Sequence, residues 1–329
     1  MTPALVLSRR LLCGLSLAAI AAPLRAEPVP IVRPWPRRPV RLMTCLADSR
    51  SEAMARTLAG ALGARWRQAV TVDRHSSAAG AISLEAFLAT RDDHALLLAP
   101  TDMWTTPPTP VGRFVDPARD LLPLAAVAQD VIVVAVAAKS GLGTLDEVIE
   151  AARRRPGALT WTSVSPSPAF AFSSVVRAAR VQLAFTPSRT SMSPLADLSE
   201  GRLDLALLPM PSAIEATQGG RIRLLAVASA ARAPSAPAVP TVAEAGYPAL
   251  MTMSGHGLFG SRTTPSVQRT RIGDDVGAAV RDLAVAERLA RMGYRPWQDS
   301  PVVFAAQLER EHARWSEMDQ PAYNITAAQ

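Results

Sequence analysis

The chain has 329 residues, of which 49% are hydrophobic and 19% charged, and these values exclude an intrinsically disordered protein. The length is sufficient for two packed domains. The formal net charge is +7, but the arginines are scattered among acidic residues, and no helix-turn-helix, zinc-finger or RNP-like pattern accompanies them. The sequence therefore predicts a globular protein that does not bind nucleic acid, and its basic character is compatible with small anionic ligands.

The N-terminus has the features of an export signal. Ser8-Arg9-Arg10 precedes an apolar run over residues 11–22, which is followed by Pro23 and the small residue Ala26. A basic start, a short apolar run and a small residue at a cleavage point are typical of secretory signals, and this run is too short to span a bilayer. We expect residues 1–26 to be removed and the mature protein to be exported. The arginine pair fits the Tat route as well as the Sec route.

Beyond the signal, short apolar runs alternate with segments of helical periodicity. Strands are expected at 40–46, 69–72, 95–99, 131–137, 159–163, 183–186, 203–208, 222–228 and 258–261, and helices at 51–62, 81–89, 144–155, 170–180, 194–199, 212–217, from about 265, and at 302–315. This alternation predicts an α/β fold with mainly parallel strands. Ser49 with Glu52, and Thr144 with Glu147, fit the pattern of a helix-capping box.

Two apolar runs, 131–137 and 258–261, are the natural places for the chain to cross from one sheet to another. We therefore expect a two-lobed fold with two hinge crossings, in which residues 27–130 and 255–329 form the first lobe and residues 131–254 the second. A ligand cleft would lie between the lobes, at the carboxyl ends of the strands. The loops that matter are 47–51, 74–81, 100–104, 163–169 and 186–193.

Enzymatic and metal chemistry find little support in the residue pattern. His94, His256 and His312 lie far apart without an H-x-x-x-H or cysteine partner, so no metal and no cofactor are expected. The serines of 163–173 lack a G-x-S-x-G elbow, and no acid–base pair is recognisable, which argues against an enzyme. After signal removal only Cys45 remains, and we expect a buried strand thiol there.

Several stretches, in register over nearly the whole mature chain, resemble one known family. They include "GTLDEVIEAARRRPGALTW" at 143–161, "EGRLDLALLPMPSAI" at 200–214, "GGRIRLLAVASAAR" at 219–232 and "SAPAVPTVAEAGYPAL" at 235–250. The sequence resembles the solute-binding proteins of tripartite tricarboxylate transporters, the Bug family. The resemblance implies a monomeric periplasmic binding protein of the type II (Venus-flytrap) class that closes around a small carboxylated metabolite and delivers it to membrane permease subunits.

The resemblance also implies where the ligand binds. The first lobe would hold a carboxylate through the loops 47–51 and 75–80, with backbone amides, hydroxyls and waters, and the second lobe would select the rest of the molecule through 163–167 and 187–190. The expected ligand-binding residues are Ser49, Arg50, Ser51, His75, Ser77, Ala78, Gly80, Thr101, Ser163, Ser165, Ser167 and Arg189.

The loops depart from the family pattern because most of their glycines are missing. Positions 48–52 read Asp-Ser-Arg-Ser-Glu, and of the second loop only Gly80 is retained. Loss of glycine removes positive-φ freedom and close approach of the backbone to a ligand. Leu208 replaces an acid that is frequent in the family, so a ligand amino group would lack that partner.

Arg50, in the first turn of an expected helix, has two possible roles. It replaces the missing amides by binding a ligand carboxylate, a contact of about 1.5–3 kcal/mol, or it pairs with Asp48 or Glu52 at the surface for about 0–1 kcal/mol. Two alternatives to transport also remain open at this point. The protein could present its ligand to a periplasmic sensor kinase, or it could be a degenerate member that no longer binds ligand.

Overall fold

The computed structural model describes residues 35–44, 49–74, 81–105, 116–187 and 193–316. The chain divides into two units, residues 1–35 and 36–329, and the elements below all belong to the second. The predicted signal of residues 1–26 and Cys45 lie outside the described residues. Within the described part of the chain, no helix combines the length and apolar character that a membrane span requires.

The first sheet has six strands in the order β11-β4-β10-β3-β1-β2. The strands are β1 (Val40–Thr44), β2 (Val70–Arg74), β3 (Ala95–Pro100), β4 (Leu121–Asp130), β10 (Gly255–Ser261) and β11 (Tyr294–Pro296). β1 is parallel to β2 and β3, whereas β10 is antiparallel to both β3 and β4. The carboxyl ends of β1 and β3 therefore lie at the same edge, as a shared binding site requires.

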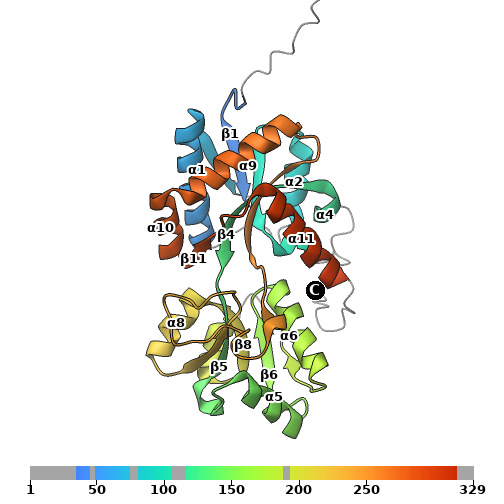
Figure 1. Cartoon of the computed structure of the whole chain (residues 1–329), viewed down its shortest axis with the longest axis vertical. Helices are drawn as coiled ribbons and strands as arrows, with labels where there is room; N and C mark the ends of the chain where they lie inside the picture. The colour runs from blue at the N-terminus through green and yellow to red at the C-terminus, as the bar shows by residue number, and fades with distance from the viewer. Residues whose placement is uncertain (1–34, 45–48, 75–80, 106–115, 188–192, 317–329) are drawn as a thin grey trace, which may run out of the picture. The chain divides into compact units, whose positions relative to one another are not determined.

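Helices cover this first sheet. They are α1 (Ser49–Trp66), α2 (Ala81–Thr90), α3 (Asp102–Thr105), α4 (Pro117–Asp120), α9 (Ser266–Arg281), α10 (Leu283–Arg291) and α11 (Pro301–Ser316). α1 buries Met54, Leu58 and Leu62, which recur every four residues along one face. α1, α9 and α10 pack against one another, and α11 contacts β4 and α3. Figure 1 shows α9 running across the strands of this sheet.

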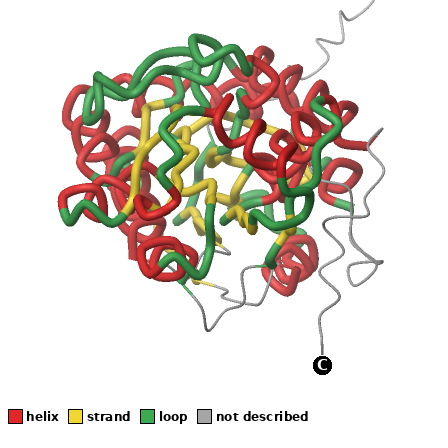
Figure 2. The backbone as a smooth tube through the Cα atoms, turned by 90° about the horizontal axis from the view of Figure 1, so that it is seen from below, coloured by secondary structure: helices red, strands yellow, loops and turns green. Residues whose placement is uncertain are grey.

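The second sheet has five strands in the order β7-β6-β8-β5-β9. Its elements are β5 (Ile132–Ala137), η3 (Ala138–Ser140), α5 (Leu145–Arg154), β6 (Thr160–Ser163), α6 (Pro166–Ala178), β7 (Ala184–Phe185), α7 (Pro194–Glu200), β8 (Leu205–Pro209), α8 (Met210–Gln218), β9 (Ile222–Val227) and η4 (Pro248–Leu250). Along β5, Val134 and Val136 belong to the core beneath α5 and α6, while Val133 and Ala135 belong to the core beneath α7 and α8. Both faces of β5 are buried, which explains its continuous apolar sequence. Figure 2, which views the whole molecule from below, shows strands in the interior and helices around them.

Local sequence signals account for several helix ends. The Thr144 side chain accepts a hydrogen bond of 3.1 Å from the backbone N–H of Glu147, which confirms Thr144 as the N-cap, while the Glu147 carboxylate accepts from the N–H of Gly143, one residue before the cap. Gly201 ends α7 with a φ of 68°, a left-handed conformation that glycine adopts without steric cost. Pro166 stands at the start of α6, where the missing N–H costs no helical hydrogen bond.

The chain crosses between the two sheets at two adjacent points. It leaves the first sheet after Asp130, enters the second at Ile132, and returns to the first at Gly255. The two crossing segments are hydrogen-bonded to each other, because Asp130 N–H donates to the Ser254 carbonyl over 3.0 Å. A Cβ at position 255 would lie 2.4 Å from the Ala128 carbonyl oxygen, so only glycine permits this close approach.

These observations confirm the expected fold class, an α/β fold of two sheets joined by two crossings. The lobe boundaries at residues 130 and 254 stay a prediction. The expectation of mainly parallel strands was wrong, since β5 runs antiparallel to β8 and β9, and β10 antiparallel to its two neighbours. The strands entered at the two crossings, β5 and β10, thus run against their sheet neighbours.

Strands β4 and β11 were not predicted, and the starts of α1, α6 and α8 were placed too late. β4 contains Pro123 and several alanines, which weaken the strand signal, and β11 has only three residues. α1 begins at Ser49 and continues to Trp66, whereas the expected helix covered 51–62. α6 begins at Pro166, four residues before the expected start, so Ser167 lies in its first turn and not in a loop.

Candidate functional site

Arg50 lies in the first turn of α1, directly after the region that follows β1. Its Nη2 lies 3.2 Å from Oδ1 of Asp130, and its guanidinium sits over the Tyr294 ring at 4.5 Å from the centroid. The Arg50 side chain is 27% exposed and that of Asp130 is 12% exposed. A guanidinium carries several N–H donors, so one contact with Asp130 does not exhaust its capacity to bind a carboxylate.

A group of buried polar side chains surrounds this ion pair. The Ser51 hydroxyl lies 3.3 Å from the Tyr294 hydroxyl, and the Tyr294 ring meets the His256 ring edge-on at 5.3 Å. His256 Nδ1 lies 3.8 Å from Oδ2 of Asp130. We call Arg50, Asp130, His256 and Tyr294 the crossing cluster, because Asp130 ends β4 at the first crossing and His256 follows the second.

The end of β3 contributes two further polar residues to the same region. Thr101 is fully buried and its hydroxyl donates to the Gly255 carbonyl at 3.2 Å, so it is held against the second crossing. Asp102 follows as the first residue of α3 and is 6% exposed. The pKa of the Asp102 carboxyl is raised from 3.8 to about 6, chiefly because burial disfavours the ionised form; the negative charge of Asp130 acts in the same direction, and hydrogen bonding to Ser167 and Ser165 opposes the shift.

The second sheet presents its serines at the end of β6. The Ser163 hydroxyl donates to the Ser165 carbonyl over 2.8 Å, which stabilises the turn between β6 and α6. Ser167, in the first turn of α6, is 2% exposed, α6 contacts α3, and interaction with Ser167 lowers the pKa of the Asp102 carboxyl against the effect of burial. The expected serine loop therefore meets an element of the first sheet.

The structure thus brings part of the predicted site together. Arg50 and Ser51 join the crossing cluster, Thr101 is bonded to the second crossing, Ser167 interacts with Asp102, and Ser163 and Ser165 form the adjoining turn. Ser49 is exposed at the start of α1. His75, Ser77, Ala78, Gly80 and Arg189 lie outside the described residues.

The proposed surface pairing of Arg50 with Glu52 is wrong. Glu52 instead accepts from Arg74 at 2.8 Å and from Arg56, while Arg50 turns toward Asp130. Asp48, the other partner considered, lies outside the described residues. Arg50 is therefore directed toward the crossing between the sheets, and its role toward a ligand stays a prediction.

Four residues of this region were not predicted to contribute: Asp102, Asp130, His256 and Tyr294. Asp102 stands inside the loop 100–104 that the sequence had indicated, so an acid directly after a buried strand was the available signal. Asp130 immediately precedes the predicted crossing. Tyr294 and His256 depend on β11 and the start of β10, and neither segment has a pattern that reveals it from sequence.

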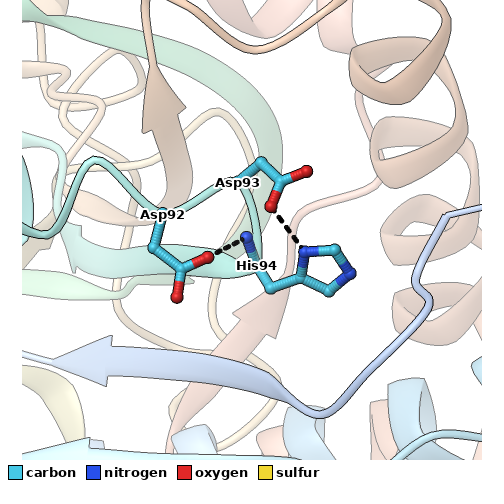
Figure 3. Close-up of side chains that lie close together, drawn as sticks. All are labelled: Asp92, Asp93 and His94. Atoms are coloured by element: carbon cyan, nitrogen blue, oxygen red, sulfur yellow. Dashed lines mark hydrogen bonds and ion pairs between the residues drawn. The ribbon is translucent and has the colours of Figure 1, made fainter.

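Asp92, Asp93 and His94 form the one group of metal-ligand type among the described residues, and Figure 3 shows them at the start of β3. His94 Nε2 accepts from the Arg37 backbone N–H at 3.0 Å, and its Nδ1 lies 2.7 Å from Oδ1 of Asp93. Arg38 binds both carboxylates. We call Arg38, Asp92, Asp93 and His94 the outer cluster. Both imidazole nitrogens of His94 already have partners and Arg38 neutralises the acids, so this cluster holds residues 37–38 against the start of β3 and is not suited to a metal.

Comparison with known proteins identifies the family of this chain. The sequence profile described as tripartite tricarboxylate transporter family receptor (TctC) matches residues 54–320. The chain belongs to this family. Its family is one of solute-binding receptors and not of enzymes.

Individual relatives resemble this receptor over almost the full length. The UPF0065 protein in the tcbD-tcbE intergenic region of Pseudomonas sp. (strain P51) is 28% identical over 94% of this chain and 93% of its own. Protein BugT of Bordetella pertussis is 26% identical over 91% of this chain and 92% of its own. A solved structure of R. palustris Rpa4515 with adipate is 26% identical, with a TM-score of 0.70 over 86% of this chain and 96% of that chain.

Proposed function

We propose that this receptor captures a small carboxylated metabolite between its two lobes in the periplasm and delivers it to the membrane permease subunits of a tripartite tricarboxylate transporter. Export would use the N-terminal signal of residues 1–26. The family match supports the receptor role, and the adipate in the R. palustris relative supports a carboxylate ligand.

The observation that carries the proposal is the placement of Arg50. It stands in the first turn of α1, where backbone amides and the helix dipole already favour an anion, and it points to the crossing where the two sheets meet. A ligand carboxylate in this position would receive the guanidinium and the amides together. Asp130 and Tyr294 would hold the guanidinium in place before the ligand arrives.

The chemistry required for capture is binding without reaction. Desolvating a carboxylate is costly unless hydrogen bonds replace its water shell, and charged donors in a partly buried site provide them. The serines at the end of β6 and the start of α6 would contact the remainder of the molecule. Hinge motion at the two adjacent crossings would allow the lobes to close over the ligand.

The test is a thermal-shift screen of the mature protein against dicarboxylic, aromatic and amino acids. A ligand that binds only the folded state raises the apparent melting temperature, and above Kd the rise grows with the logarithm of the ratio of ligand concentration to Kd. We expect at least one carboxylate to raise it, and the rise to shrink in Arg50→Ala but not in Arg38→Ala, whose arginine belongs to the outer cluster. Equal responses of native protein and Arg50→Ala would contradict the role of Arg50.

A further inference from the structure

The last helix of the described chain, α11, starts in the core of the first sheet and ends against a helix of the second. Phe304 and Leu308 are fully buried in the hydrophobic core that also contains residues of β3 and β10. Trp315 stands on the same face of the helix, but its ring stacks on that of Phe170 in α6, with 5.7 Å between the ring centroids. α11 therefore contacts elements of both sheets, and Figure 1 shows it extending from the first sheet toward α6.

The aromatic contact at the end of α11 is separate from the cores of the two sheets. Phe170, Ala171 and Trp315 form a hydrophobic cluster of their own, distinct from the core clusters that contain the strands. Trp315 is 0% exposed and Phe170 is 7% exposed. Because burial of large aromatic side chains is strongly favourable, this cluster stabilises the arrangement of the two sheets that brings the rings together.

The residue before Trp315 adds a polar contact between the same two parts of the molecule. Arg314 Nη2 donates to the Ala249 carbonyl over 2.9 Å, and Ala249 lies in η4, which packs against α6. The Arg314 guanidinium also lies over the Trp315 ring, 4.3 Å from its centroid, and its Nη1 lies 3.6 Å from Oε1 of Glu311. We call Phe170, Ala249, Arg314 and Trp315 the interlobe contact.

Hinge motion at the two crossings would change the interlobe contact, because its two sides are fixed to different sheets. On one side, Phe304 holds α11 so close to β10 that a Cβ at Gly257 would lie 2.4 Å from its ring. On the other side, Phe172 of α6 and Leu250 of η4 are buried in a core of the second sheet. Rotation of one sheet relative to the other must therefore separate or shift the two stacked rings.

We propose that the interlobe contact holds the two lobes together around a bound ligand, so that the end of α11 sets how firmly the ligand is retained. The retention of ligand rests on the proposed function, whereas the hold on the lobes does not depend on it. Trp315 acts here as a positioning residue, which fixes α11 against α6 without touching the ligand. Apparent affinity scales with the fraction of molecules in the binding-competent arrangement, so loss of the contact weakens binding while every ligand-binding side chain stays in place.

The test removes the interlobe contact from either side. Trp315→Ala and Phe170→Ala each delete one stacked ring, Trp315→Phe keeps an aromatic ring, and Arg314→Ala removes the hydrogen bond to η4. Arg310→Ala, at an exposed position of the same helix, is the matched control. Small-angle X-ray scattering of the mature protein without ligand gives the radius of gyration, circular dichroism checks that each variant is folded, and calorimetric titration with adipate and with succinate gives Kd.

We expect Trp315→Ala and Phe170→Ala to have a larger radius of gyration than the native protein, and to bind the acids about tenfold more weakly. Trp315→Phe should lie between them and the native protein, and Arg310→Ala should match the native protein in both measurements. If neither alanine variant of the two rings folds, Arg314→Ala decides, with a smaller change in the same direction.

Two results would overturn the interlobe contact as a hold on the lobes and on the ligand. One is a native radius of gyration in every folded variant, and the other is native or tighter Kd in variants whose radius has increased. Failure of both acids to bind the native protein counts against the proposed function alone, since the scattering comparison without ligand still decides whether α11 holds the lobes.

Discussion

The crossing cluster and the outer cluster contain the same kinds of residue in different surroundings. Each combines arginine, aspartate and histidine, but in the outer cluster the Arg38 side chain is 52% exposed and both acids are bound to it. In the crossing cluster the Arg50 and Asp130 side chains are mostly buried, and the buried residue Asp102 stands nearby. Residue type alone therefore does not distinguish the two clusters, whereas burial of the ion pair at the crossing between the sheets does.

Asp102, beside the crossing cluster, and Asp92, in the outer cluster, have carboxyl pKa values shifted in opposite directions. Burial raises the pKa of Asp102, whereas a hydrogen bond from Arg38 lowers the pKa of Asp92. The first arrangement opposes the ionised acid and the second favours it. Variants that remove the charge of single acids in these two regions test this contrast.

The largest effect is expected from Asp102→Asn. Because the pKa of Asp102 in the folded protein is raised from 3.8 to about 6, its contribution to stability is fully present below 3.8 and is lost as the pH rises through about 6. The loss corresponds to about 3 kcal/mol in the free energy of unfolding. Urea unfolding of native protein and Asp102→Asn between these pH values should show this fall in the native protein only; parallel profiles would contradict the burial argument.

A smaller effect is expected from Asp130→Ala. Removing the carboxylate leaves the partly buried Arg50 without this partner, and loss of such a contact should lower the free energy of unfolding by about 2 kcal/mol. The double variant with Arg50→Ala should lose less than the sum of the two single changes, because the two residues act through one contact. Strict additivity in denaturant unfolding would show that the pair is not coupled.

The outer cluster should respond more weakly and with the opposite dependence on pH. Because the pKa of Asp92 is lowered, its contribution to stability is present above its ordinary pKa of 3.8 and is lost as the pH falls through the lower value. Arg38 is exposed to solvent, so Asp92→Asn should cost about 1 kcal/mol or less near neutral pH. A stability profile that moves in the same direction as that of Asp102 would remove the contrast between the clusters.

The smallest effect is expected from Asp93→Asn. Asp93 is 53% exposed, and we expect a change of about 0–1 kcal/mol in unfolding free energy and none in ligand affinity. Ligand titration of this variant separates the clusters functionally. Weaker binding after this change would mean that the outer cluster contributes to the site.

Sequence patterns predicted the regular parts of the fold and missed the irregular ones for identifiable reasons. The alternation of buried faces along β5 and the capping of α5 by Thr144 are local features, so both could be predicted. β4 was missed because its signal is weakened by Pro123, and its partners β10 and β11 come from distant parts of the chain. Pairing between distant segments leaves no local pattern.

In the candidate site too, features encoded by local sequence could be predicted and pairings between distant residues could not. Arg50 and the serines could be predicted because they follow strands, but their partners could not. Asp130 meets Arg50 across 80 positions of sequence, and Tyr294 meets Ser51 across 243. The contact of Asp102 with Ser167 depends on how elements of the two sheets meet, which no local motif encodes.

The most direct test of the central claim is calorimetric titration of the carboxylate identified by the screen into native protein, Arg50→Ala and Arg38→Ala. The account predicts one binding site per chain in the native protein, an affinity lower by about tenfold to a hundredfold in Arg50→Ala, and native affinity in Arg38→Ala. Native affinity in Arg50→Ala, or equal losses in both arginine variants, would contradict a carboxylate site at the crossing between the sheets.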